Sequence, residues 1–372
     1  MSLAPARLAW LDALRGPAAL AVTMHHAGWT FIPQVWAEVD RRIDLGTLGV
    51  FVFFLVSGYI IPASLERRGE LPAFWAGRAF RLLPLLLAAC GLALALARAG
   101  VVPLHPGIGE RPVAMVALGN VTMLQELLNV PPVINVMWTL SYEMAFYLVS
   151  VALFAARRAR ASAGIAVGLA VAAVPLGLLL PRAAIGGGAD LVAALLGLAV
   201  VAAIALTVLG GGRARTAAAV AGGVLGLALV VLGSRGGTWQ GMIILATMFA
   251  GTAVYRAEQG TIAWRTAGFA VVAVVACGLP AKDDPGWAPA IVAASALFAA
   301  AYALRGRAFP RWLSGLGLIS FSLYLLHPIL LHVLPDPALF FLVLIPLSLL
   351  TYHLIESPAQ RLGRRLIRRG RS

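Results

Sequence analysis

The polar residues best suited to chemistry lie inside strongly apolar stretches of the chain. In LDALRGPAALAVTMHHAGW, Arg15 and His26 are eleven residues apart. On a helix this spacing puts both on one face, about 16 Å apart along the axis. Imidazole titrates near neutral pH and can act as a general base or as a nucleophile. Because ionisable groups are costly in an apolar helix, we interpret this pair as functional.

Three further stretches carry ionisable side chains where an apolar run begins or continues. Arg78 and Arg81 are three residues apart and share a helix face. Paired guanidiniums can hold phosphates through forked hydrogen bonds, although spacing alone favours anchoring at a membrane surface. Glu143 lies about two turns into WTLSYEMAFYLV, and His327 lies in ISFSLYLLHPIL. A carboxylate at such a depth needs a partner or a raised pKa.

The composition predicts an integral membrane protein. Hydrophobic residues make up 61% of the chain and charged residues 12%, and the mean hydropathy is +0.90. A soluble domain carries roughly twice that share of charge. Apolar runs of about 17 to 22 residues match a bilayer-spanning helix. We predict an all-α bundle of about ten to twelve transmembrane helices, at 10–29, 48–65, 80–98, 137–156, 163–181, 189–210, 216–233, 240–255, 265–280, 288–304, 315–333 and 338–356.

The charge distribution predicts the topology. The net charge of +14 and the pI of about 11.2 would suggest nucleic acid in a soluble protein. In a membrane protein, Lys and Arg gather in cytoplasmic loops, so we predict no nucleic-acid partner. The same rule favours cytoplasmic N- and C-termini and keeps 113–128 on the outer side, or re-entrant, rather than spanning.

This topology sorts the polar residues by depth. His26, Glu143 and His327 fall in the outer half of the bilayer, and the three arginines named above fall in the inner half. The depths predict an acid–base cluster that faces outward, an anion clamp that faces inward, and a passage between them.

The domain organisation is simple. Because the longest polar loops hold fewer than 20 residues, we predict one membrane domain over 1–372 and no soluble extracytoplasmic domain. The tail after Pro358 has six arginines and is predicted to lie on the anionic inner leaflet. Cys90 and Cys277 are too far apart in sequence to indicate a metal site, and no bound cofactor is predicted.

Taken in order, the motifs resemble those of membrane-bound acyltransferase family 3, the bacterial O-acetyl and O-acyltransferases. The matching segments are LDALRG followed by a histidine, GVFVFFLVSGYII, the arginine pair, WTLSYEMAFYL, ISFSLYLLHPIL and LIESPAQRL. They fall in two motif-bearing parts, 9–156 and 315–362, which flank Ala/Leu/Gly-rich helices over 163–304. Three positions depart from the pattern or complicate it: Ala13, His25 and Met144.

The resemblance implies a donor, an acceptor and a location. The donor would be cytoplasmic acyl-CoA, usually acetyl-CoA, and the acceptor a hydroxyl of an envelope carbohydrate or a similar molecule at the bacterial inner membrane. By motif position, His26 would be the catalytic base or acyl carrier, Arg15 its partner, and Glu143 a support for proton transfer, while Arg78 and Arg81 would bind CoA phosphates. The remaining candidates for acceptor binding or support are Trp138, Ser141, Tyr324, His327 and Glu356.

One alternative class of function fits the same composition. A transporter or flippase for an anionic or sugar substrate would also have many spans and intramembrane charges. Such a protein predicts internal repeats, and the two halves of this chain show no convincing match.

Overall fold

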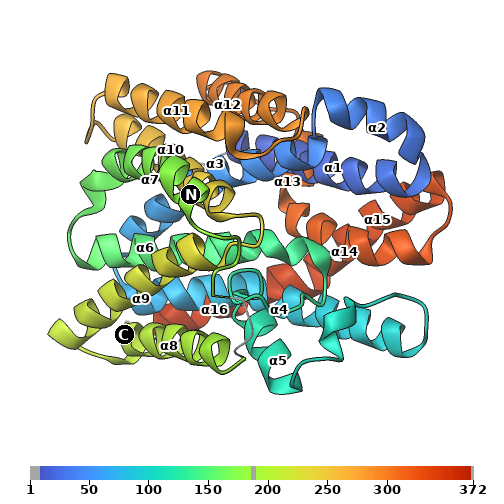
Figure 1. Cartoon of the computed structure of the whole chain (residues 1–372), viewed down its shortest axis with the longest axis horizontal. Helices are drawn as coiled ribbons and strands as arrows, with labels where there is room; N and C mark the ends of the chain where they lie inside the picture. The colour runs from blue at the N-terminus through green and yellow to red at the C-terminus, as the bar shows by residue number, and fades with distance from the viewer. Residues whose placement is uncertain (1–8, 186–189, 370–372) are drawn as a thin grey trace.

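The computed structural model describes residues 9–185 and 190–369, which form an all-helical bundle with most long helices roughly parallel (Figure 1). The prediction of an all-α polytopic membrane protein is confirmed. The helices are α1 (Ala9–Phe31), α2 (Pro33–Arg42), α3 (Leu45–Arg68), α4 (Leu71–Arg98), α5 (Val113–Val121), α6 (Trp138–Ala155), α7 (Ser162–Leu179), α8 (Asp190–Leu209), α9 (Gly212–Gly233), α10 (Thr238–Glu258), α11 (Trp264–Gly278), α12 (Trp287–Ala303), α13 (Arg311–Leu318), α14 (Ser320–Val333), α15 (Pro337–Thr351) and α16 (Ser357–Arg369).

The number of candidate spans is lower than the sequence predicted. Within the described residues, eight helices are long and apolar enough to cross a membrane, or nine if α13 and α14, bent by 64°, count as one broken span. Three predicted spans fall outside that count. α12 has only 17 residues, whereas α1 and α10 are long enough but contain too many polar residues to be counted. All three are nevertheless helical, as predicted.

The segment 113–128 does not form a long helix. α5 has nine residues, which at 1.5 Å per residue is too short to cross a bilayer. The chain then runs through turns that the Asn120 side chain holds together. Its Nδ2 donates to the carbonyls of Val116 at 2.9 Å and Pro131 at 3.0 Å, and its Oδ1 accepts from the Val133 amide at 2.9 Å. The segment's side of the membrane stays a prediction.

Glycines let the central helices pack backbone against backbone. A Cβ atom on Gly58 would lie 1.9 Å from the Met248 carbonyl oxygen, and one on Gly251 would lie 2.3 Å from the Leu55 carbonyl oxygen. Thr252 adds a hydrogen bond of 2.8 Å to the Gly58 carbonyl. Small residues of this kind are how membrane helices approach closely. The α3–α10 contact therefore fixes α3, whose opposite face borders the site described below.

The broken helix pair holds α1 in place at its start. A Cβ atom on Gly317 of α13 would lie 2.1 Å from the Asp12 carbonyl oxygen, and one on Gly16 would lie 2.6 Å from the Leu316 Cβ. The chain then bends at Ile319, so that α14 also packs along α1. This bend brings a histidine of α14 to the later turns of α1.

Candidate active site

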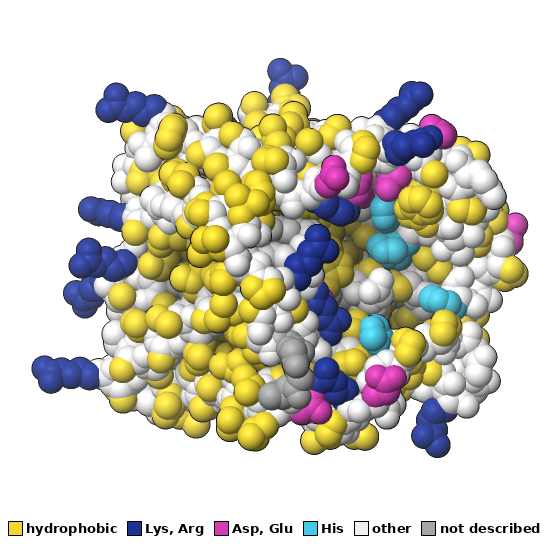
Figure 2. Space-filling model, viewed as in Figure 1, with side chains coloured by type: hydrophobic (Ala, Val, Ile, Leu, Met, Phe, Trp, Pro, Cys, Tyr) yellow, Lys and Arg dark blue, Asp and Glu magenta, His cyan; other side chains and the backbone are white. Residues whose placement is uncertain are grey.

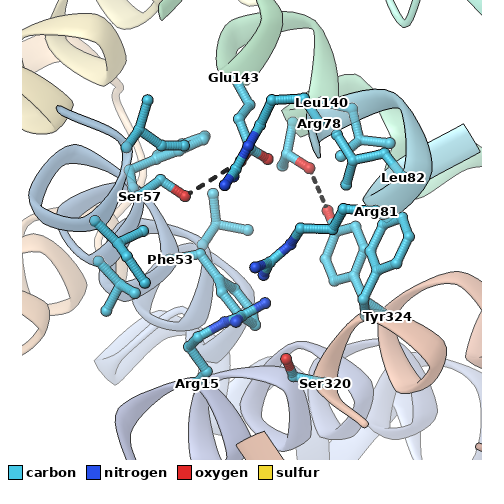
Figure 3. Close-up of a pocket in the computed structure, with 17 residues that line it drawn as sticks. Arg15, Phe53, Ser57, Arg78, Arg81, Leu82, Leu140, Glu143, Ser320 and Tyr324 are labelled. Atoms are coloured by element: carbon cyan, nitrogen blue, oxygen red, sulfur yellow. Dashed lines mark hydrogen bonds between the residues drawn. The ribbon is translucent and has the colours of Figure 1, made fainter. Parts of the chain in front are cut away.

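Three arginines converge on a cavity enclosed by α1, α3, α4, α6 and α14 (Figure 3). Its volume is about 720 Å³ including its open mouth, and we call it the arginine cavity. Much of its wall is apolar. Its polar side chains are Arg15, Ser57, Arg78, Arg81, Thr139, Glu143, Ser320 and Tyr324. The structure thus brings together the three arginines that the sequence placed at one depth as an anion clamp. On the molecular surface, basic side chains gather along a hollow beside the histidines (Figure 2).

Arg78 is held in a position suited to an anion. The residue is 8% exposed, and its Cζ lies 5.7 Å from the Phe74 ring centroid and 5.8 Å from that of Tyr147. These rings stabilise the guanidinium through cation–π contacts. Its Nη2 reaches Ser64 Oγ at 3.5 Å, but its buried Nε has no hydrogen-bond partner in the described part of the chain. Because an unpaired buried donor is costly, this N–H suits an anionic ligand.

Glu143 faces the arginines rather than the histidines. Tyr147, one turn further along α6, donates its hydroxyl to Oε1 of Glu143, and Ser57 donates to the same oxygen at 3.5 Å. The sequence placed this carboxylate at the depth of His26 and His327, yet of these three residues only Glu143 lines the arginine cavity.

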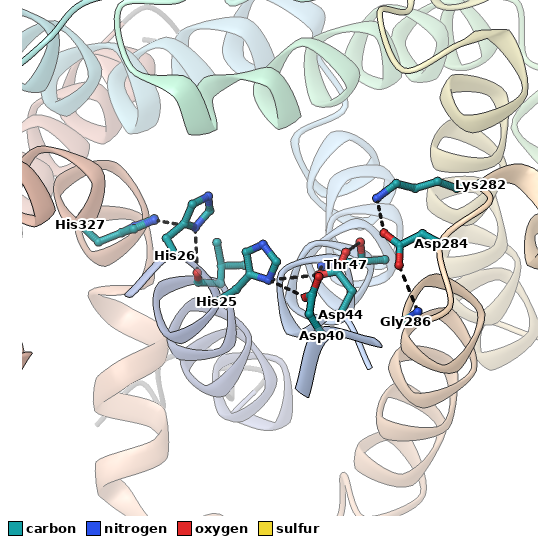
Figure 4. A network of polar contacts seen from close by, with 10 residues as sticks. His25, His26, Asp40, Asp44, Thr47, Lys282, Asp284, Gly286 and His327 are labelled. Carbon is teal, nitrogen blue, oxygen red and sulfur yellow. Dashed lines mark hydrogen bonds and ion pairs between the residues drawn. The ribbon is translucent and has the colours of Figure 1, made fainter. Parts of the chain in front are cut away.

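The two predicted histidines form a contact pair (Figure 4). Nε2 of His327 lies 3.3 Å from Nδ1 of His26. Nδ1 of His26 also lies 2.9 Å from the Val22 carbonyl oxygen, and Nδ1 of His327 lies 3.0 Å from that of Leu323. Since a carbonyl oxygen only accepts, we assign the proton to Nδ1 in both neutral rings. Within the described residues, Nε2 of His26 has no hydrogen-bond partner and keeps its lone pair for an incoming proton.

Tyr324 connects the arginine cavity with the histidine pair. Its hydroxyl donates to the Val136 carbonyl at 2.8 Å and contacts Thr139 Oγ1 at 2.8 Å. Its ring centroid lies 6.1 Å from that of His327, one turn further along α14. The tyrosine is therefore part of the wall that separates the arginines from the imidazoles.

His25 belongs to a separate polar group. Its Nδ1 lies 3.3 Å from the carboxylates of both Asp40 and Asp44, and these three side chains could in principle hold a metal ion. An ion pair accounts for the same geometry, and Asp44 is already engaged as the N-cap of α3. Burial, with Asp44 and Asp284 nearby, raises the pKa of Asp40 to about 6. His25 and His26 thus have different partners.

Comparison with known proteins identifies the family. Residues 8–352 match the family model described as an acyltransferase domain, acyltransferase 3. The chain belongs to the acyltransferase 3 family. It is 32% identical over 123 residues to the exopolysaccharide production protein ExoZ of Rhizobium meliloti (strain 1021), covering 30% of this chain and 35% of ExoZ. It is 33% identical over 149 residues to the acyltransferase MdmB of Streptomyces mycarofaciens, covering 38% of each protein. The chain therefore spans little more than a third of either relative, and no solved structure matches it.

Several of the predicted residues lie outside the arginine cavity of this family member. Ser141 is fully buried, and its Oγ accepts from the Glu126 amide at 3.2 Å, which holds the chain that follows α5. Trp138 packs its ring against Tyr142 at 6.0 Å. Glu356 is 3% exposed and accepts a hydrogen bond from Ser322 at 2.5 Å. It ends a π-helical turn, an irregularity that is frequent at functional sites.

The sequence missed some residues of the site. Ser57 lines the cavity but was not among the predicted site residues, whereas its neighbour Gly58 packs against α10. The residues one turn to either side of Glu143, Thr139 and Tyr147, were not singled out. Their spacing of four places them on the Glu143 face of α6, so helical periodicity could have found them.

Proposed function

We propose that this acyltransferase moves an acyl group, most simply acetyl, from cytoplasmic acyl-CoA to a hydroxyl of an envelope carbohydrate or a similar acceptor in the bacterial inner membrane. The observation that carries the proposal is the convergence of three guanidiniums on one cavity inside an apolar bundle, next to a paired imidazole. Membership of an acyltransferase family supports the same reaction class.

The arginine cavity suits the donor. Coenzyme A carries a diphosphate and a phosphomonoester, and guanidiniums bind such groups through charge-assisted hydrogen bonds. Arg78 and Arg81 would hold the phosphates, and the apolar remainder of the wall would receive the arm that ends in the thioester. Burial raises the strength of each contact because the local dielectric constant is low.

His26 suits the proton transfer. The acceptor hydroxyl would give its proton to Nε2 of His26 while its oxygen attacks the thioester carbonyl carbon. The tetrahedral intermediate would then collapse as the C–S bond breaks, and the imidazolium would return the proton to the departing thiolate. The Val22 carbonyl and the bare Nε2 of His327 both accept from Nδ1 of His26, so they would stabilise the imidazolium. A covalent acyl-histidine would use the same Nε2 atom.

The acceptor is proposed from the relatives. One matched protein is named for exopolysaccharide production and another as an acyltransferase. Both names are compatible with transfer to a sugar hydroxyl outside the cytoplasm.

The test measures transfer of radiolabelled acetyl from acetyl-CoA to envelope glycan in membranes. We expect His26→Ala to lower the transfer rate by roughly 10²- to 10⁴-fold, and Arg78→Ala to raise the KM for acetyl-CoA. His332→Ala is the matched control, because His332 bonds its own helix at Pro328 in the same way, at 2.8 Å, but is exposed at the end of α14. Full activity in both site variants would refute the mechanism.

A further inference from the structure

A second basic cavity lies directly against the arginine cavity. Its volume is about 670 Å³ including its open mouth, and it shares Ile60, Arg78 and Arg81 with the first. Its walls come from the end of α3, the start of α4 and the C-terminal helix α16. We propose that this cavity binds the nucleotide end of the acyl donor, including its 3′-phosphate, and that α16 is a wall of the donor site; this inference rests on the proposed use of acyl-CoA.

The charge of the second cavity matches that ligand. It is lined by five arginines, with no acidic side chain among the described residues that line it. A diphosphate carries about two negative charges and a phosphomonoester about −1.5 to −2 at neutral pH, so the guanidiniums can neutralise the ligand. The arginines are Arg67, Arg68, Arg78, Arg81 and Arg364.

Two of these arginines are held in place before any ligand arrives. The guanidinium of Arg68 packs against α4 at Gly77. A Cβ atom at this position would lie 2.6 Å from the guanidinium, so a larger residue would displace it. Its Nη1 donates to the Ala73 carbonyl at 2.8 Å. Arg78 is buried between aromatic rings and stands at the junction of the two cavities. Such preorganisation lowers the entropic cost of binding.

Close packing seats α16 against α4. A Cβ atom on Gly363 would lie 2.7 Å from the Phe80 Cβ, so the two helices touch at this point. The cavity-lining residues of α16 are Gln360, Gly363, Arg364 and Ile367, and their spacing puts them on one helix face. Arg364 is exposed at the edge of this face, whereas its neighbour Arg365, also exposed, is turned about 100° from it and points away from the cavity-lining face.

One face of α16 lines the proposed donor site, and the other face is left to contact lipid. The sequence predicted that the whole arginine-rich tail rests on anionic lipid, in which case Arg364 and Arg365 would act alike. The structure assigns Arg364 to the cavity instead, and leaves the other face for the bilayer surface. Phosphate chemistry is common to both ligands, so the experiment must distinguish the nucleotide from a lipid headgroup.

The experiment compares Arg364→Ala with Arg365→Ala in full-length protein, using acetyl-CoA and 3′-dephospho-acetyl-CoA as donors. We expect Arg364→Ala to raise the KM for acetyl-CoA about tenfold, to leave kcat within twofold, and to reduce the preference for acetyl-CoA over the dephospho donor. We expect Arg365→Ala to behave like the wild type. Equal effects of the two variants, or an unchanged donor preference in Arg364→Ala, would overturn the inference.

A second set of measurements varies the lipid composition. The same measurements are made in nanodiscs of phosphatidylcholine alone and with phosphatidylglycerol added. The KM effect of Arg364→Ala is expected in both, whereas its disappearance in the neutral lipid would assign Arg364 to a headgroup. Wild-type protein that transfers no acetyl from either donor would instead refute the proposed function, so the two failures can be told apart.

Discussion

His26 and His327 lie 301 residues apart in the chain, yet Nε2 of His327 is 3.3 Å from Nδ1 of His26. The contact joins α1 to α14 and fixes the direction of the shared hydrogen, because each Nδ1 also faces a main-chain carbonyl. Nε2 of His327 therefore accepts a hydrogen bond from Nδ1 of His26, the ring nitrogen that takes no part in the proton transfer. This hydrogen bond would stabilise the imidazolium formed when Nε2 of His26 takes up a proton. We interpret His327 as a positioning residue for the base.

The first prediction concerns His327. Replacement by Phe keeps a ring but removes the acceptor of the His26 hydrogen. Hydrogen bonds to charged groups contribute about 1.5 to 3 kcal/mol, so we expect kcat to fall roughly 10- to 100-fold while the KM for acetyl-CoA stays within twofold. Steady-state transfer assays test this, with His332→Phe as the control. A change in KM alone would contradict the role assigned to His327.

The second prediction decides the role of Arg15. The resemblance made Arg15 a partner of His26, whereas the structure places it in the arginine cavity with Arg78 and Arg81. Arg15→Lys keeps the charge but loses the forked donors. If Arg15 acts on the donor, the KM for acetyl-CoA rises about tenfold and kcat changes little. A fall in kcat at constant KM would show instead that Arg15 acts together with His26 in catalysis.

Sequence reasoning gave the elements of this fold more reliably than the contacts among them. The length and apolarity of each run determine a membrane helix, so every predicted span is helical. Depth along the membrane normal also follows from sequence, but rotation about each helix axis does not. Glu143 was for that reason grouped with the histidines, although it faces the arginines.

The contacts that sequence could not supply depend on tertiary packing. The His26–His327 pair exists because α13 lies against α1 at Gly16 and Gly317, and nothing local in either helix encodes that approach. The carboxylate partners of His25 come from α2 and the start of α3 in the same way. The candidate spans are fewer than the apolar runs read from the sequence because α12 is short and because α1 and α10 carry more polar residues than the other long helices.

The third prediction tests the α3–α10 contact. Gly58→Ala would place a methyl group 1.9 Å from the Met248 carbonyl oxygen, and overpacking of this kind costs about 1 to 3 kcal/mol. We expect a lower unfolding temperature in detergent. Gly91→Ala is the matched control, because nothing lies within 4 Å of a Cβ at that position of α4, and it should be neutral or stabilising by about 0.5 to 1 kcal/mol. Equal stability of the two variants would contradict the packing described here.

The fourth prediction is a pH dependence set by Asp40, on α2. Burial raises the pKa of this carboxyl from 3.8 to about 6, with Asp44 and Asp284 adding to the effect and Lys282 opposing it. Between these two pH values the folded protein binds more protons than the unfolded chain, so the contribution of Asp40 to stability falls as the pH rises. Above about pH 6 the full cost of the buried charge is present.

Asp40→Asn removes that charge and keeps a side chain of similar size. We expect the variant to gain stability over the wild type at pH 7.5 and to lose this advantage on acidification towards pH 4.5, as measured by thermal unfolding in detergent. Glu38→Gln, an exposed carboxylate on the same helix that pairs with Arg41, controls for the general loss of negative charge from α2. A stability difference between Asp40→Asn and the wild type that does not change with pH would contradict the raised pKa of Asp40.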